Sequence, residues 1–160
     1  MGIAKSMMRN AGDGAYVLKA LKENERICPY KGRLLHSREE AIEASKTSQY
    51  VLDFNGVAVD AKDAGTCTSR FINDALDKNL WNCEFRLVGK EIWVFATRPI
   101  EKWEKLLLPY GWEYWWRRRL TLGKAMMGMA ARAYPEISEI LNSGRCKLTK
   151  KAKTAQQENS

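Results

Sequence analysis

The chain of 160 residues has few of the side chains that bind metals or act as acid–base catalysts. It contains one histidine, His36, and no cluster of cysteine or carboxylate at ligand spacing surrounds it. The four cysteines are widely spaced, form no C-x-x-C pair, and stand at Cys28, Cys67, Cys83 and Cys146. A zinc knuckle needs such pairs, so we expect no metal site and assign His36 to the surface or to packing.

Long hydrophobic runs are also missing. No stretch of about 18 apolar residues is present, which a membrane-spanning helix requires. The first ten residues, MGIAKSMMRN, lack the apolar core of a secretory signal. Reduced thiols are the natural state of such a chain. We therefore expect an intracellular protein that does not span a membrane.

Acidic residues become scarce toward the C-terminus. Residues 1–113 carry 17 basic and 16 acidic side chains, a balance of +1. Residues 114–160 carry 10 basic and 3 acidic ones, a balance of +7. A basic region on a near-neutral domain suits a polyanionic partner, with nucleic acid or a nucleic-acid-bound protein first. Improved solubility alone is the alternative.

The patterns that are present are mainly those of short strands. Asn55-Gly56 separates two β-branched runs, at residues 50–54 and 57–60, and predicts a tight hairpin. Gly89-Lys90 separates residues 81–88 from 91–96 in the same way. The sequence predicts further short strands near residues 26–30 and 33–35 and an irregular turn around Phe71.

Two helices are predicted. Ser37 can cap a helix over residues 37–45, with Glu40 three residues later. Residues 114–134 favour a longer helix, because apolar residues recur there at spacings of three and four. The fold class is therefore α+β and mostly β, with small helical insertions and a C-terminal helix.

The pattern divides the chain into four parts. We expect a flexible arm over residues 1–11 and a β-rich domain over residues 12–115. A helical extension follows over residues 116–142. Residues 143–160 are polar and rich in lysine, which predicts a basic tail without ordered structure.

One tyrosine is set in an unusual context. Pro109 and Gly111 flank Tyr110, and proline restricts the backbone while glycine frees it. Further aromatic side chains follow at Trp112, Tyr114 and Trp115. This arrangement predicts that the Tyr110 hydroxyl is held in a fixed direction inside an aromatic channel.

Four motifs stand in a familiar order. They are Gly12-Asp13-Gly14 leading to Pro29-Tyr30-Lys31-Gly32, then Val59-Asp60-Ala61 with Arg70-Phe71-Ile72-Asn73, then Phe95-Ala96-Thr97-Arg98-Pro99-Ile100, and then the segment that ends at Gly111. Over roughly residues 12–115 this order resembles the SET domain of protein-lysine methyltransferases, which has a β-clip-like fold. The chain is similar to compact members without post-SET cysteines and shares features of the PR/SET subgroup.

The chain departs from the family pattern at two places. Asp74 and Ala75 follow Asn73, where the family usually has histidine and serine. Before the last apolar run the family usually reads Gly-Glu-Glu, and here the residues are Trp103-Glu104-Lys105.

The resemblance implies S-adenosylmethionine as cofactor and a role for each matching residue. Tyr110 would be the catalytic residue. The channel for the substrate lysine would be lined by Tyr50, Phe95 and Tyr114. The cofactor-binding residues would be Gly12, Asp13, Gly14, Ala15, Asn73, Asp74 and Trp112.

The implied activity is methylation of a protein lysine, with a histone tail as substrate and the nucleus as location. The basic C-terminal region would contact DNA or a nucleosome, and a homodimer through the methionines of residues 126–129 is a further expectation. Two alternatives stay open. One is a catalytically inactive SET-like scaffold, or a chromatin or nucleic-acid-binding module. The other is a basic amphipathic helix for a membrane or a calmodulin-like partner.

Overall fold

The computed structural model describes residues 1–8, 11–63, 65 and 67–143. The chain divides into two compact units. The first consists of residues 1–75 and 79–109, and the second of residues 76–78 and the chain from Tyr110 onward. The second unit thus begins at Tyr110, whereas the sequence analysis ended the β-rich domain at residue 115. The predicted basic tail lies outside the described residues, apart from Ser143, as do residues 9–10 of the predicted arm.

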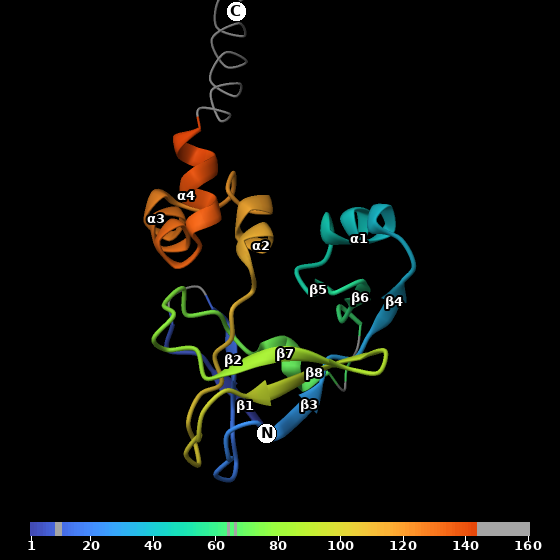
Figure 1. The fold of residues 1–160 in the computed structure, drawn as a ribbon, viewed down its shortest axis with the longest axis vertical. Helices are drawn as coiled ribbons and strands as arrows, with labels where there is room; N and C mark the ends of the chain where they lie inside the picture. Colours follow the sequence, from blue (N-terminus) through green and yellow to red (C-terminus); the bar gives the residue numbers. More distant parts are fainter. Residues whose placement is uncertain (9–10, 64, 66, 144–160) are drawn as a thin grey trace, which may run out of the picture. The chain divides into compact units, whose positions relative to one another are not determined.

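Three small antiparallel sheets form the first unit (Figure 1). One pairs β1 (Gly2–Lys5) with β2 (Asp13–Tyr16). The second has the order β3 (Arg26–Pro29), β8 (Glu91–Ala96), β7 (Cys83–Val88), and the third the order β4 (Arg33–Leu35), β6 (Val57–Asp60), β5 (Val51–Phe54). A short helix, α1 (Arg38–Ser45), and a 3-10 turn, η1 (Thr68–Phe71), complete the unit. The predicted α+β class with mostly strands is confirmed.

The N-terminal segment differs from the expected flexible arm. Gly2 pairs with Tyr16 and Lys5 with Asp13, so β1 runs antiparallel along β2. The Ser6 N–H donates to the Gly12 carbonyl at 2.8 Å, which closes the connection. The residues of β1 have little β-propensity of their own, and the strand exists because β2 offers an edge with which to pair.

Both predicted hairpins are confirmed. Asn55 and Gly56 adopt φ values of 48° and 82°, the left-handed conformations that a two-residue turn between twisted strands requires. β5 and β6 pair across this turn. Gly89 has φ 63° and turns β7 into β8, which stay in register from Cys83 opposite Ala96 to Val88 opposite Glu91.

The predicted helix cap is also confirmed. The Ser37 hydroxyl accepts from the Glu40 N–H at 3.0 Å at the start of α1. The Glu40 carboxylate reaches back to the His36 N–H at 2.8 Å, so two backbone donors before the helix are satisfied. Ala41 is buried, whereas Ile42, expected on the same apolar face, is 45% exposed.

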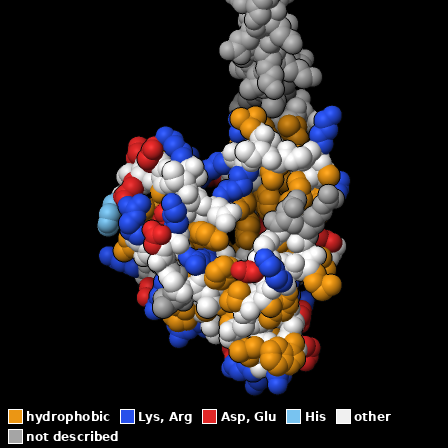
Figure 2. Space-filling view, turned by 180° about the vertical axis from the view of Figure 1, so that it is seen from behind, with side chains coloured by type: hydrophobic (Ala, Val, Ile, Leu, Met, Phe, Trp, Pro, Cys, Tyr) orange, Lys and Arg blue, Asp and Glu red, His pale blue; other side chains and the backbone are white. Residues whose placement is uncertain are grey.

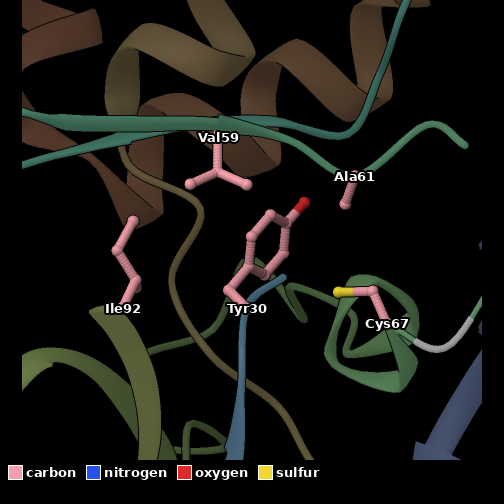
Figure 3. Close-up of a cluster of buried hydrophobic side chains, with 5 residues drawn as sticks. All are labelled: Tyr30, Val59, Ala61, Cys67 and Ile92. Carbon is pink, nitrogen blue, oxygen red and sulfur yellow. The ribbon is translucent and has the colours of Figure 1, made fainter. Parts of the chain in front are cut away.

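A buried cluster connects the second sheet to the third. It consists of Tyr30, Val59, Ala61, Cys67 and Ile92 (Figure 3). The Tyr30 hydroxyl donates to the Tyr50 carbonyl at 2.8 Å, and its ring meets Phe85 edge-on with centroids 5.7 Å apart. Burying such an aromatic side chain contributes on the order of 2 kcal/mol, and the hydroxyl stays satisfied inside the core. The cluster therefore fixes the backbone at Tyr50.

The described part of the second unit holds three helices, and two of them replace the single helix predicted over residues 114–134. The three helices are α2 (Trp112–Arg117), α3 (Lys124–Ala133) and α4 (Pro135–Asn142). Gly123 is extended, with ψ 159°, and caps α3, so it separates α2 from α3 rather than lying inside a helix. Pro135 starts α4 at the position where its missing N–H costs nothing. None of the helices in the described ranges is long and apolar enough to cross a bilayer.

Candidate functional site

The edge of β2 at Gly14 has no room for a side chain. A Cβ atom on Gly14 would lie 2.9 Å from Lys105 Cε and 3.1 Å from Asn73 Oδ1. Ala15, the next residue, is fully buried, and its carbonyl accepts from the Leu106 N–H at 2.8 Å. Glycine is therefore required here because two side chains from elsewhere in the sequence lie directly over the backbone.

Asn73 lies beside this edge, as the sequence predicted. Its Nδ2 donates to the Asp13 carbonyl at 3.1 Å and to the Ala11 carbonyl at 3.4 Å. Asn73 is 7% exposed, and its Oδ1 is buried without a hydrogen-bond partner among residues 1–8, 11–63, 65 and 67–143. An unsatisfied buried acceptor costs about 1–3 kcal/mol. The site therefore holds an amide oxygen that a ligand with an N–H donor would stabilise.

The other residues predicted to bind the cofactor have surroundings that differ from those of Gly14 and Asn73. Gly12 adopts φ 61°, and Asp13 is exposed with Lys5 at 4.0 Å. Asp74 is buried, and its carboxylate accepts from Trp81 Nε1 at 2.9 Å, which gives it a packing role. Trp112 is half-buried at the first position of α2, in the second unit.

Residues 105–108 form an extended segment that crosses the first unit, and we call it the crossing segment. Leu106 and Leu108 are buried, at 0% and 1% exposure. The Leu108 N–H donates to the Asn73 carbonyl at 3.1 Å, and Leu107 forms a parallel bridge with Asn73. The segment leads directly to Pro109 and Tyr110, so its bonds fix the place at which the chain leaves the first unit.

Asn82 holds this segment, and the sequence analysis did not identify it. It is 1% exposed. Its Nδ2 donates to the Lys105 carbonyl at 2.8 Å, and its Oδ1 accepts from the Leu107 N–H at 2.9 Å. The Asn82 N–H donates to the Leu107 carbonyl at 2.9 Å. No local pattern distinguishes this asparagine from one in a turn, because its partners lie more than twenty residues away.

Glu104, just before the crossing segment, accepts three hydrogen bonds. Its carboxylate accepts from Arg98 Nη2 at 2.6 Å, from the Glu101 N–H at 2.9 Å and from Asn82 Nδ2 at 3.2 Å. Burial raises the pKa of this carboxyl, but the bonds from Arg98, Glu101 and Asn82 outweigh it and lower the pKa below 4.5.

We expect Glu104→Gln to lower the free energy of unfolding by about 1 kcal/mol near neutral pH. The folded pKa is depressed, so this stabilisation is present above the unfolded pKa and is lost as pH falls through the folded pKa. Urea unfolding at pH 7 and pH 3 measures the difference. The gap between the variant and the wild type should narrow from pH 7 to pH 3, and an equal gap at both pH values would contradict the assignment. Glu101→Gln, an exposed neighbour, serves as control.

The tyrosine predicted to be catalytic lies in an aromatic cluster of the second unit. The Tyr110 ring stacks on Trp115 with centroids 5.9 Å apart and an interplanar angle of 14°. Tyr114 meets it edge-on at 4.6 Å. Gly111 has φ 87°, and its N–H donates to the Tyr134 hydroxyl at 3.2 Å. Glycine is needed at position 111 because of this left-handed backbone.

Tyr114 is held by an arginine. The Arg118 guanidinium lies 3.7 Å from the centre of its ring, and Arg118 Nη1 donates to the Tyr114 carbonyl at 3.3 Å. One ring face therefore already carries a cation, which demonstrates the affinity of this face for positive charge.

Tyr50, the second predicted channel residue, lies in the first unit. Its N–H donates to the Ser48 hydroxyl at 3.1 Å, and its carbonyl accepts from the Tyr30 hydroxyl. The Arg70 guanidinium lies 5.1 Å from the ring centre, and Arg70 Nη1 donates to the Ala61 carbonyl at 2.8 Å. Both the backbone and the ring of Tyr50 are thus fixed.

Phe95 is not brought together with Tyr50. Side chains on β8 alternate between the two faces, with Ile92 on the buried face and Phe95 on the other. Tyr50 packs against the cluster that contains Ile92, whereas the Arg86 guanidinium covers the Phe95 ring at 4.9 Å. This placement does not support the channel role expected of Phe95.

The single histidine takes no part in either group of residues. His36 is exposed and is the pale-blue side chain in Figure 2. Its N–H is engaged by Glu40 at the start of α1. The expectation that it is a surface residue is confirmed.

Comparison with solved structures finds similar folds. One is the humanized mutant of the Chaetomium thermophilum Polycomb Repressive Complex 2 bound to the inhibitor GSK126, with a TM-score of 0.58 and 26% identity over 68% of this chain. Another is ctPRC2 in an autoinhibited conformation bound to S-adenosylmethionine, with a TM-score of 0.56 and 23% identity over 73% of this chain. The present chain covers 14% and 16% of those chains.

No curated protein matches the sequence. The SET domain as a family matches residues 12–111, which is more than half of the chain. This range contains the Gly14 edge, Asn73, Asn82, the crossing segment and Tyr110. The chain belongs to the SET-domain family.

Proposed function

We propose that this protein is an S-adenosylmethionine-dependent protein-lysine N-methyltransferase. The observation that carries the proposal is the position of the buried Asn73 Oδ1, which has no hydrogen-bond partner among the described residues, directly over Gly14. Family membership and the S-adenosylmethionine bound to ctPRC2 support the choice of cofactor.

The residues at the Gly14 edge fit the amino-acid end of this cofactor. The α-ammonium of the cofactor is a hydrogen-bond donor. Asn73 Oδ1 is an acceptor that has no hydrogen-bond partner among the described residues. Asn73 Nδ2 meanwhile ties the strand to the loop through Asp13 and Ala11, so the edge is preorganised. When bound, the cofactor would supply a methyl group on a sulfonium, and a neutral amine can accept this group as the thioether leaves, without a strong base on the protein.

The aromatic residues suit the methyl acceptor, which is the side chain of a substrate lysine. A lysine must lose its proton before it attacks, and apolar surroundings lower the pKa of an ammonium. Tyr110 orients the amine through its hydroxyl, and the aromatic ring of Tyr114 beside it suits the cationic forms of lysine. In the first unit, the ring of Tyr50, which has the Arg70 guanidinium 5.1 Å from its centre, is proposed separately as a surface for such a cation.

The substrate that we favour is a histone tail, and the location that follows is the nucleus. The basic balance of residues 114–160 is suited to contact with DNA or a nucleosome during this reaction. Contact with DNA and formation of a homodimer stay predictions. A catalytically inactive SET-like scaffold is the second candidate, favoured by Asp74 and Lys105 at positions where the family usually has other residues.

Calorimetry tests the proposal directly. The full chain is expected to bind S-adenosylmethionine with a Kd on the order of micromolar, about −8 kcal/mol. Asn73→Ala is expected to weaken this binding roughly tenfold or more, because the acceptor for the ammonium is lost. Gln49→Ala, on an exposed loop, is the control. No detectable binding by the wild-type chain would reject the methyltransferase and leave the scaffold.

A further inference from the structure

Lys105 occupies an unusual position over the Gly14 edge. Its Nζ lies 3.2 Å and its Cε 2.9 Å from the point where a Gly14 Cβ would be, and Asn73 Oδ1 lies 3.1 Å from the same point. An ammonium donor and an amide acceptor therefore both lie over the backbone of Gly14.

The ammonium of Lys105 has no carboxylate partner. No ion pair of Lys105 occurs within residues 1–8, 11–63, 65 and 67–143, and its Nζ donates to the Ser6 hydroxyl. The side chain is half-buried, so water screens its charge less than at the surface. Desolvation by the surrounding residues lowers the pKa of this lysine. An anion bound beside it would relieve that cost.

The two groups complement an amino acid. The α-carbon of an amino acid carries both an ammonium and a carboxylate, so it needs an acceptor and a cationic donor close together. Asn73 Oδ1 provides the acceptor and Lys105 Nζ provides the donor. Gly14, which has no Cβ, leaves room for both groups beside the strand.

We propose that Lys105 binds the α-carboxylate of the cofactor's amino-acid end, while Asn73 accepts its α-ammonium. This inference rests on the proposed function. It assigns Lys105 a role in cofactor selection, because a ligand without the carboxylate would meet an unpaired ammonium. The Ser6 hydroxyl positions that ammonium from the connection between β1 and β2.

Decarboxylated S-adenosylmethionine, which differs only in the missing carboxylate, is the matched probe. We expect the wild-type chain to bind S-adenosylmethionine roughly 10- to 100-fold more tightly than this probe, as a charge-assisted hydrogen bond allows. Lys105→Met keeps the unbranched side chain up to the position of Cε and removes the charged Nζ. This variant should bind the two ligands with equal affinity, through weaker binding of S-adenosylmethionine.

The control is Lys102→Met. Lys102 is exposed, and its ammonium lies 5.2 Å from the centre of the Trp103 ring. The Lys102→Met variant should keep the wild-type preference for S-adenosylmethionine over the decarboxylated probe. Retained binding of the decarboxylated probe by Lys105→Met, together with an unchanged melting transition, demonstrates that this variant is folded.

The outcomes separate this inference from the proposed function. If the wild type binds S-adenosylmethionine and Lys105→Met keeps the same preference, the role of Lys105 is overturned and the methyltransferase stands. The same conclusion follows if the variant loses both ligands equally. If the wild type binds neither ligand, both proposals fail.

Discussion

Tyr110→Phe is expected to bind S-adenosylmethionine like the wild type and to transfer the methyl group roughly 10²- to 10³-fold more slowly. Loss of one positioned hydroxyl in a reaction of this kind costs about that factor. The ring stacks on Trp115 and contacts Tyr114 through its faces and edges, and phenylalanine can keep these contacts. The folded state should therefore survive, and the loss should appear in kcat more than in KM.

The measurement uses a lysine-containing histone-tail peptide and single-turnover methyl transfer, with cofactor affinity from calorimetry. Tyr16→Phe is the matched control, because its hydroxyl makes only a weak contact of 3.5 Å with the Lys5 carbonyl. Its rate should equal that of the wild type. An unchanged rate and an unchanged number of methyl groups for Tyr110→Phe would remove Tyr110 from the proposed role.

Asn82→Ala is expected to lower the free energy of unfolding by roughly 2–5 kcal/mol. The substitution leaves the Leu107 N–H and the Lys105 carbonyl buried without partners, and each costs about 1–3 kcal/mol. It also opens a small space beside a side chain that is 1% exposed. The urea midpoint should fall while the m-value stays constant, because the surface exposed on unfolding is unchanged.

Asn82→Asp makes this test specific. Aspartate can still accept from the Leu107 N–H, but it cannot donate to the Lys105 carbonyl, and it places a second carboxylate beside Glu104. We expect it to be at least as destabilising as alanine. Gln49→Ala, on the surface, should leave the midpoint unchanged. A stable Asn82→Asp variant would show that donation from Nδ2 does not hold the crossing segment.

Features that depend on adjacent residues could be predicted from the sequence. Asn55-Gly56 specifies its own turn, since both residues tolerate positive φ, and Ser37 with Glu40 specifies its own cap. Gly111 likewise adopts φ 87°, which uses the backbone freedom that the sequence indicated beside Tyr110. The order of motifs was sufficient to identify the family.

The tertiary structure decided the features that depend on distant partners. β1 is a strand because β2 offers an edge with which it pairs. The division of the predicted helix into α2 and α3 at Gly123 was not predicted, although it rests on a local residue. Strand alternation on β8 separated Phe95 from Tyr50, although the family pattern had grouped the two residues.

The candidate cofactor site shows the same division between sequence and tertiary structure. Asn73 could be predicted from its motif, and the sequence also placed Gly14 at the strand edge. Two features could not be predicted: Asn82 as the residue that holds the crossing segment, and Lys105 lying over Gly14 beside the unsatisfied Oδ1 of Asn73. Their contacts join parts of the chain separated by more than twenty residues. These partners come together only when the chain folds and closes the long segments between them. Local sequence patterns therefore do not predict the contacts.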